Sequence, residues 1–123
     1  MIRNMTHEQL CALLDVLPME LAFVDAEDRV RFWNRMDERG PAWKPSVLDG
    51  PVQACHLESS APAVNGVLAK LKSGQRDVVD RTVTIDGKVT RFRWFAVRDE
   101  QGRYLGCLEM IQYGTEVVSS PTS

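Results

Sequence analysis

The chain has 123 residues, 44% of them hydrophobic, which is the size of one domain with enough apolar material for one core. Its formal net charge of -2 comes from acidic and basic residues mixed along the chain, without a basic stripe for nucleic acid or a polybasic run for a membrane surface. No apolar run approaches the roughly 20 residues that span a bilayer, and the N-terminus lacks the apolar core of a signal peptide. The three cysteines, Cys11, Cys55 and Cys107, are odd in number and far apart, as in reduced proteins. We therefore expect one cytoplasmic domain that binds neither nucleic acid nor membrane.

The first predicted element is an amphipathic helix in the N-terminal segment, residues 1–17. Thr6 and Gln9 have the T-x-x-Q form of a capping box, and Pro18 ends the segment. Four leucines recur after the box at helical spacing: Leu10, Leu13, Leu14 and Leu17. This apolar face packs either on its own domain, which is the more common arrangement, or on a second subunit.

A β-hairpin is expected next. Residues 21–26 and 29–33 are rich in β-formers, and Glu27-Asp28 between them favours a turn. From residue 34 to residue 50 prolines and glycines are too closely spaced for a long helix, so this stretch is predicted as loops and short helical turns.

One longer helix and three strands complete the predicted order. Val64, Val67, Leu68 and Leu71 recur at helical spacing before a basic last turn and Gly74. Strands are then expected over residues 77–85, 89–98 and 104–113, joined by hairpin turns at Asp86-Gly87 and at residues 99–102. Residues 117–123 are small and polar and are predicted to be a disordered tail.

Several short sequence motifs occur in a characteristic order between about residues 17 and 116. They are Leu17-Pro18, Phe23-Val-Asp25, Val30-Arg-Phe32, Gly50, Cys55-His56, Lys72-Ser-Gly74, Phe95-Ala-Val-Arg-Asp99 and Gly102-Arg-Tyr-Leu-Gly-Cys-Leu-Glu109. Together with the predicted order of helices and strands, these motifs resemble a PAS domain, and in particular the PAS subgroup attached to hemerythrin-like domains in bacteria.

The resemblance implies an α+β fold over residues 18–116. Its expected form is a five-stranded antiparallel sheet with short helices and one longer helix on one face, plus the N-terminal helix. Such a fold encloses a pocket for a small ligand or cofactor, often dimerises, and usually senses rather than catalyses. The sequence departs from the family pattern at two places. Pro62 lies where that subgroup commonly has a further histidine, and Tyr113-Gly114-Thr115 replaces the usual Asp-Ile-Thr ending.

Strand periodicity locates part of the expected pocket. In residues 89–98, Arg91 and Arg93 fall on one face and are expected to point to water, while Phe92 and Trp94 fall on the other and point inward. These aromatic side chains either fill the core, which is the more common case, or line a pocket.

The last strand presents two faces whose direction periodicity leaves open. The resemblance places Ile111 where flavin-binding relatives have an inward glutamine, which turns Cys107 and Glu109 inward as well. Leu108 and Met110 would then form an outer apolar face for the first helix or a partner. Glu109 would be a ligand anchor or a proton-dependent switch, or else would lie at the rim or pair with an arginine.

Cys55 and His56 are candidate metal or haem ligands, since a thiolate and an imidazole both bind transition metals. The alternative is that Cys55 packs as a small apolar group and His56 hydrogen-bonds to the loop. Flavin photochemistry is disfavoured, because Ile111 has no side-chain amide to hydrogen-bond a flavin and the Asn-Cys-Arg motif of flavin photoreceptors is absent.

The sequence thus predicts a cytoplasmic, homodimeric bacterial PAS sensor that binds a small molecule and signals to a separate effector protein. The predicted ligand-binding residues are Val24, Cys55, His56, Phe92, Trp94, Cys107, Glu109 and Ile111. The predicted partner surface is Leu10, Leu13, Leu14, Leu17, Leu108 and Met110. The alternatives are a haem- or metal-binding PAS protein and a ligand-free interaction module. An enzyme is not expected, because the sequence offers no convincing acid-base pair for a cavity of the ketosteroid-isomerase type.

Overall fold

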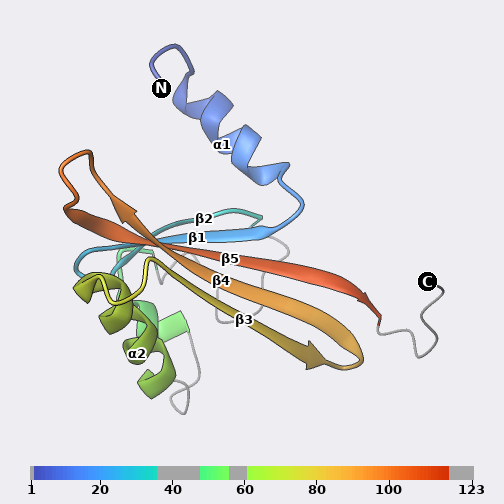
Figure 1. The fold of residues 1–123 in the computed structure, drawn as a ribbon. Coiled ribbons are helices and arrows are strands. Elements are labelled where there is room, and N and C mark those ends of the chain that lie inside the picture. The colour runs from blue at the N-terminus through green and yellow to red at the C-terminus, as the bar shows by residue number, and fades with distance from the viewer. Residues whose placement is uncertain (1, 36–47, 56–60, 117–123) are drawn as a thin grey trace.

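A computed structural model describes residues 2–35, 48–55 and 61–116 of the chain. Its elements follow in the order α1 (His7–Asp15), β1 (Glu20–Asp25), β2 (Val30–Trp33), η3 (Val52–Cys55), α2 (Ala61–Ser73), β3 (Val78–Ile85), β4 (Lys88–Arg98) and β5 (Tyr104–Glu116). The strands form one antiparallel sheet in the order β2-β1-β5-β4-β3 (Figure 1). The expected α+β class and five-stranded antiparallel sheet are confirmed.

The central position of β5 comes from pairing the two ends of the fold. The meander β3-β4-β5 is built from local hairpins, and β1 then pairs with the free side of β5. As a result β5 has β1 on one side and β4 on the other. It extends three residues beyond the predicted end at Tyr113, because pairing with β4 continues to the Lys88–Glu116 pair.

Helix α2 packs against one face of the sheet, which we call the inner face (Figure 1). Leu68 and Leu71 of α2 are buried, as their helical spacing predicted. They form a core with apolar side chains of β1, β2, η3 and β5: Ala22, Val24, Val30, Trp33, Val52 and Cys107. The apolar stripe of α2 thus covers the centre of the inner face.

The N-terminal helix is shorter and more exposed than its leucine pattern predicted. The capping box is confirmed: Gln9 N–H donates to Thr6 Oγ1 at 3.0 Å, and Thr6 N–H donates to Gln9 Oε1 at 2.9 Å. The helix ends at Asp15, so Leu17 lies beyond it, and none of its residues is buried. Figure 1 shows α1 projecting from the sheet on the side away from α2.

Asn34, which is fully buried, joins the end of α1 to the sheet. Its Oδ1 accepts a hydrogen bond from Leu21 N–H at 2.6 Å, and its Nδ2 donates to the carbonyls of Leu14 at 2.8 Å and Met19 at 3.1 Å. One amide therefore connects the last turn of α1, the entry to β1 and the end of β2.

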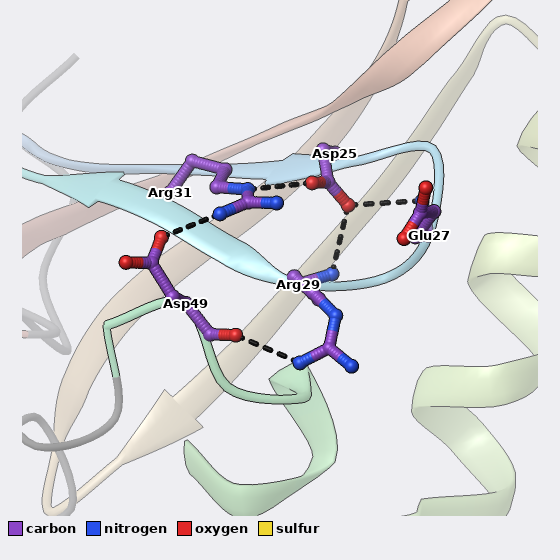
Figure 2. A network of polar contacts seen from close by, with 5 residues as sticks. All are labelled: Asp25, Glu27, Arg29, Arg31 and Asp49. Carbon is purple, nitrogen blue, oxygen red and sulfur yellow. Dashed lines mark hydrogen bonds and ion pairs between the residues drawn. The ribbon is translucent and has the colours of Figure 1, made fainter.

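The turn between β1 and β2 is held by the network in Figure 2. Asp25 Oδ1 accepts hydrogen bonds from the backbone N–H groups of Glu27 at 2.9 Å and Arg29 at 3.0 Å, and Asp25 Oδ2 accepts from Arg31 Nε at 2.6 Å. Burial raises the pKa of Asp25, but these hydrogen bonds outweigh it and the net pKa is lowered.

The same network fastens the segment that begins at residue 48. Arg31 Nη1 donates to Asp49 Oδ1 at 2.6 Å, and Arg29 Nη1 donates to the Asp49 carbonyl at 2.9 Å (Figure 2). Backbone hydrogen bonds join Gly50 to Val30 and Val52 to Asp28. Val52 is thereby held in the core. Most of the loop predicted over residues 34–50, and the predicted tail 117–123, lie outside the described residues.

Candidate functional site

A cavity of about 740 Å³ lies between α2 and the inner face of the sheet. Its walls are mostly aliphatic and aromatic, with four charged residues among them. The apolar lining is Val24, Val52, Ala63, Val64, Gly66, Val67, Leu68, Val79, Val83, Ile85, Phe92, Trp94, Cys107 and Ile111, and the charged lining is Lys70, Asp80, Arg81 and Glu109.

The cavity brings together most of the residues that the sequence singled out for ligand binding. Six of the eight line it: Val24, Phe92, Trp94, Cys107, Glu109 and Ile111. Strand register explains this, because Trp94 and Val24 pair with Glu109 and Cys107 of β5, and Phe92 pairs with Ile111. Cys55 ends η3, and its side chain and all of His56 lie outside the description.

Glu109 provides a buried carboxylate on the central strand. It is only 6% exposed, and its Oε2 accepts a hydrogen bond from Trp94 Nε1 at 2.9 Å. The rings of Trp94 and Phe92 are stacked, with centroids 6.0 Å apart and planes 13° apart. The rim position considered for Glu109 is therefore wrong, and an indole is a partner that the sequence did not reveal.

Cys107 is a neutral wall of the cavity. Burial, and then the nearby charges of Glu109 and Asp28, raise the pKa of its thiol to about 12. A thiol that stays protonated at neutral pH is a poor nucleophile and a poor metal ligand. Its contribution to the site is a small apolar surface beside Glu109.

The sequence predicted a pocket beneath the central helix, but the lining residues of α2 and β3 were not among the predicted ones. Ala63, Gly66, Val67 and Lys70 follow at i, i+3, i+4 and i+7 on one helix face. On β3 the lining residues Val79, Arg81, Val83 and Ile85 alternate along the strand. The predicted hairpin turn at Asp86-Gly87 was the available signal, because it sets the register in which Val79 pairs with Trp94 and Arg81 with Phe92, and side chains opposite an inward aromatic also point inward.

The other side of the sheet, which we call the outer face, carries both charged and apolar side chains. Arg91 is exposed as predicted and pairs with Asp80 at 2.6 Å. Arg93, also predicted to point to water, is half-buried instead: its guanidinium lies 5.7 Å from the Phe95 ring centroid and donates to Met110 Sδ at 3.1 Å. Leu108 and Met110 are half-buried on this face.

The predicted apolar stripe of α1 lies partly open to solvent. Leu13 is 47% exposed, and Leu10, Leu14 and Leu17 are half-buried. His7, elsewhere on the helix, lies 3.5 Å from Cys11 in an exposed i,i+4 pair. Within residues 2–35, 48–55 and 61–116, no three His, Cys, Asp or Glu side chains are grouped to hold a metal ion. No helix in that part of the chain is long and apolar enough to cross a membrane.

Comparison with known proteins decides the family. The sequence profile of the PAS domain matches residues 10–112, most of the chain. The chain belongs to the PAS domain family. PAS domains are typical of sensor and signalling proteins, are generally sensory rather than catalytic, and often mediate protein interactions or dimerisation.

Solved structures agree with this assignment. A C-terminal domain from Streptococcus mutans superimposes with a TM-score of 0.80 at 30% identity, covering 91% of this chain and 89% of that one. A sensory box sensor histidine kinase from Vibrio cholerae has a TM-score of 0.67 at 13% identity, with 88% and 90% covered. The PAS domain of Bordetella pertussis BvgS has a TM-score of 0.61 at 20% identity, with 89% and 86% covered. The latter two structures show a shared fold. A comparison with curated proteins found no match to the sequence.

Proposed function

We propose that this PAS domain is a cytoplasmic sensor module that takes up a small ligand in the cavity between α2 and the sheet. The observation that carries the proposal is the cavity of about 740 Å³ with apolar walls and one buried carboxylate, Glu109. Small-molecule sites are typically about 300–1,000 Å³, mostly apolar, with a few polar groups that orient the ligand. Trp94 holds Glu109 in place, so the polar group is already oriented before a ligand enters.

The ligand would contact Val24, Phe92, Trp94, Cys107, Glu109 and Ile111. Cys55, the last residue of η3, and His56, the next residue in the sequence, stay in the proposed set because the first residue of η3, Val52, lines the cavity. Glu109 would act as the polar anchor, because a buried carboxylate rewards a ligand that brings a hydrogen-bond donor.

Gly66→Leu tests occupancy of the cavity. Gly66 lies on the cavity face of α2, and a Cβ there would meet no atom within 4 Å, so leucine can extend into the empty space. Leucine is also a better helix former than glycine, so the fold should be retained. Native mass spectrometry of the wild-type protein, compared with denaturing mass spectrometry, should reveal a bound species that G66L lacks.

The matched control is Gly66→Ala, which makes the same backbone change without filling the cavity. It should bind the same species and unfold at a similar or higher temperature than wild type. A wild-type protein with no bound species, and no thermal shift with a metabolite panel, would refute the ligand-binding proposal and favour a ligand-free interaction module.

Signalling would pass through protein contacts at Leu10, Leu13, Leu14 and Leu17 of the N-terminal segment and at Leu108 and Met110 of the outer face. The exposed Leu13 and the half-buried Leu10 and Leu14, in a helix with no buried residue, support this surface. We propose a homodimer that presents this surface to a separate effector, and place the chain in the PAS subgroup associated with bacterial hemerythrin-like proteins.

Leu13→Asp tests the partner surface. It should shift the protein toward monomer in size-exclusion chromatography with light scattering, because a charge replaces an exposed apolar contact. Ala12→Asp adds the same charge at an exposed position outside the leucine stripe and should leave the mass unchanged. Equal masses for wild type, L13D and A12D would exclude this surface from a dimer.

A further inference from the structure

Two cationic side chains line the cavity at its border with solvent, which we call the mouth. Lys70 belongs to α2 and Arg81 to β3, which is one of the two edge strands of the sheet, and both residues are exposed. Among the described residues neither side chain forms a hydrogen bond or an ion pair. Their charges are therefore available to a ligand.

Both acidic residues of the cavity lining accept hydrogen bonds from other side chains. The Asp80 carboxylate accepts two hydrogen bonds from Arg91, at 2.6 and 3.1 Å, and the bond from Arg91 lowers the pKa of Asp80. Glu109 accepts from Trp94 and lies on the central strand β5. The cavity therefore has a negative group in its interior and two positive groups at its mouth.

Apolar side chains form most of the cavity wall around these charged groups. Val64 and Val67 of α2 lie on one side, and Val79 and Val83 of β3, with Phe92 and Trp94 of β4, lie on the other. A ligand that fills this space needs an apolar body. An anionic group on it would be repelled by Glu109 and attracted by Lys70 and Arg81, which fixes its direction.

Resting on the proposed function, we infer that the ligand is an amphipathic carboxylic acid whose carboxylate binds Lys70 and Arg81 at the mouth. Its apolar body lies between α2, β3 and β4. Arg81 offers paired N–H donors that match a carboxylate, and Lys70 adds a second charge from the opposite wall.

Three probes with the same chain and different heads test the inference: decanoate, decanol and decylamine, each titrated into the full chain by isothermal calorimetry. Decanoate should bind about tenfold more tightly than decanol. It should also bind more tightly than decylamine, whose ammonium is attracted by Glu109 but repelled by Lys70 and Arg81. The preference for decanoate should shrink as salt is added, because the mouth is exposed and its charges are screened.

The double variant Lys70→Gln/Arg81→Gln should lose the preference for decanoate while still binding decanol. The control Arg3→Gln/Lys88→Gln removes the same charge from two exposed cations outside the cavity lining and should keep it. Three outcomes would overturn the inference while leaving the proposed cavity function in place. They are equal binding of decanoate and decanol, an unchanged preference for decanoate in K70Q/R81Q, and tighter binding of decylamine than of decanoate. Failure of all three probes and of the metabolite panel would refute both.

Discussion

Trp94 Nε1 donates a hydrogen bond to Glu109 Oε2 over 2.9 Å, between paired positions of β4 and β5. The two residues are 15 apart in sequence and become neighbours only because the strands pair. The bond satisfies a buried carboxylate at the wall of an otherwise apolar cavity. It makes Trp94 both a wall of the site and a support for its acidic group.

Trp94→Phe should lower the free energy of unfolding by about 1–3 kcal/mol, because it leaves Glu109 without its indole donor. Chemical denaturation measures the loss from the midpoint at an unchanged slope. Phe92→Leu is the comparison, since it alters the aromatic stack without removing a donor. If W94F were as stable as wild type, the hydrogen bond would not support the fold.

Gly106→Ala should destabilise the protein by at least about 2 kcal/mol, because the added Cβ has no space. It would lie 2.3 Å from the Val24 carbonyl oxygen and 2.6 Å from the Phe23 ring, and the backbone φ of +155° is one that alanine rarely adopts. Gly66→Ala, made in open space on α2, should instead be neutral or stabilising by up to about 1 kcal/mol. Thermal unfolding of the two variants should therefore shift in opposite directions or differ by several degrees.

Asn34→Ala should cost about 2–4 kcal/mol, because it leaves the Leu21 N–H and two carbonyls without the amide that pairs them. Hydrogen exchange should also show faster opening of α1, whose last turn is held by this side chain. Asn65→Ala on the exposed surface of α2 provides the same chemical change at a site where stability should move by less than about 1 kcal/mol. Similar losses for both variants would contradict the linking role of Asn34.

Stability should fall as pH rises above about 9, partly through Cys107. Burial raises the pKa of this thiol from 9.0 to about 12, so between these values the unfolded chain loses a proton that the folded chain keeps. The unfolded state then binds fewer protons, and the free energy of unfolding declines by at most about 1.4 kcal/mol per pH unit for this group. Tyr104 acts in the same direction, since burial raises its pKa from 10.0 to about 12.

Denaturation midpoints from pH 8 to pH 11 measure this slope. Cys107→Ala should flatten the alkaline decline even though the smaller side chain lowers stability at pH 8. Cys11→Ala, on the partly exposed helix α1, should keep the wild-type slope. An equally steep decline in C107A would show that other groups cause the alkaline loss.

The sequence by itself determined the elements and one side of the site. Hydrophobic period, turn residues and the capping box are local signals, so the two helices, the opening hairpin and the three-stranded meander could be predicted. Alternation along β4 separates Phe92 and Trp94 from Arg91, because successive side chains point to opposite faces. The direction of Glu109 came from family resemblance, since β5 has apolar residues on both faces.

Only the tertiary structure decided what faces these residues. The packing of α2 on the sheet brings Lys70 to the cavity that Arg81 of β3 also lines. The pairing of β4 with β5 gives Glu109 its indole partner. Phe95 and Met110 lie beside Arg93 and leave that residue half-buried rather than in water. Each of these contacts joins side chains from different elements, and no local period in the sequence encodes which side chains of neighbouring elements meet.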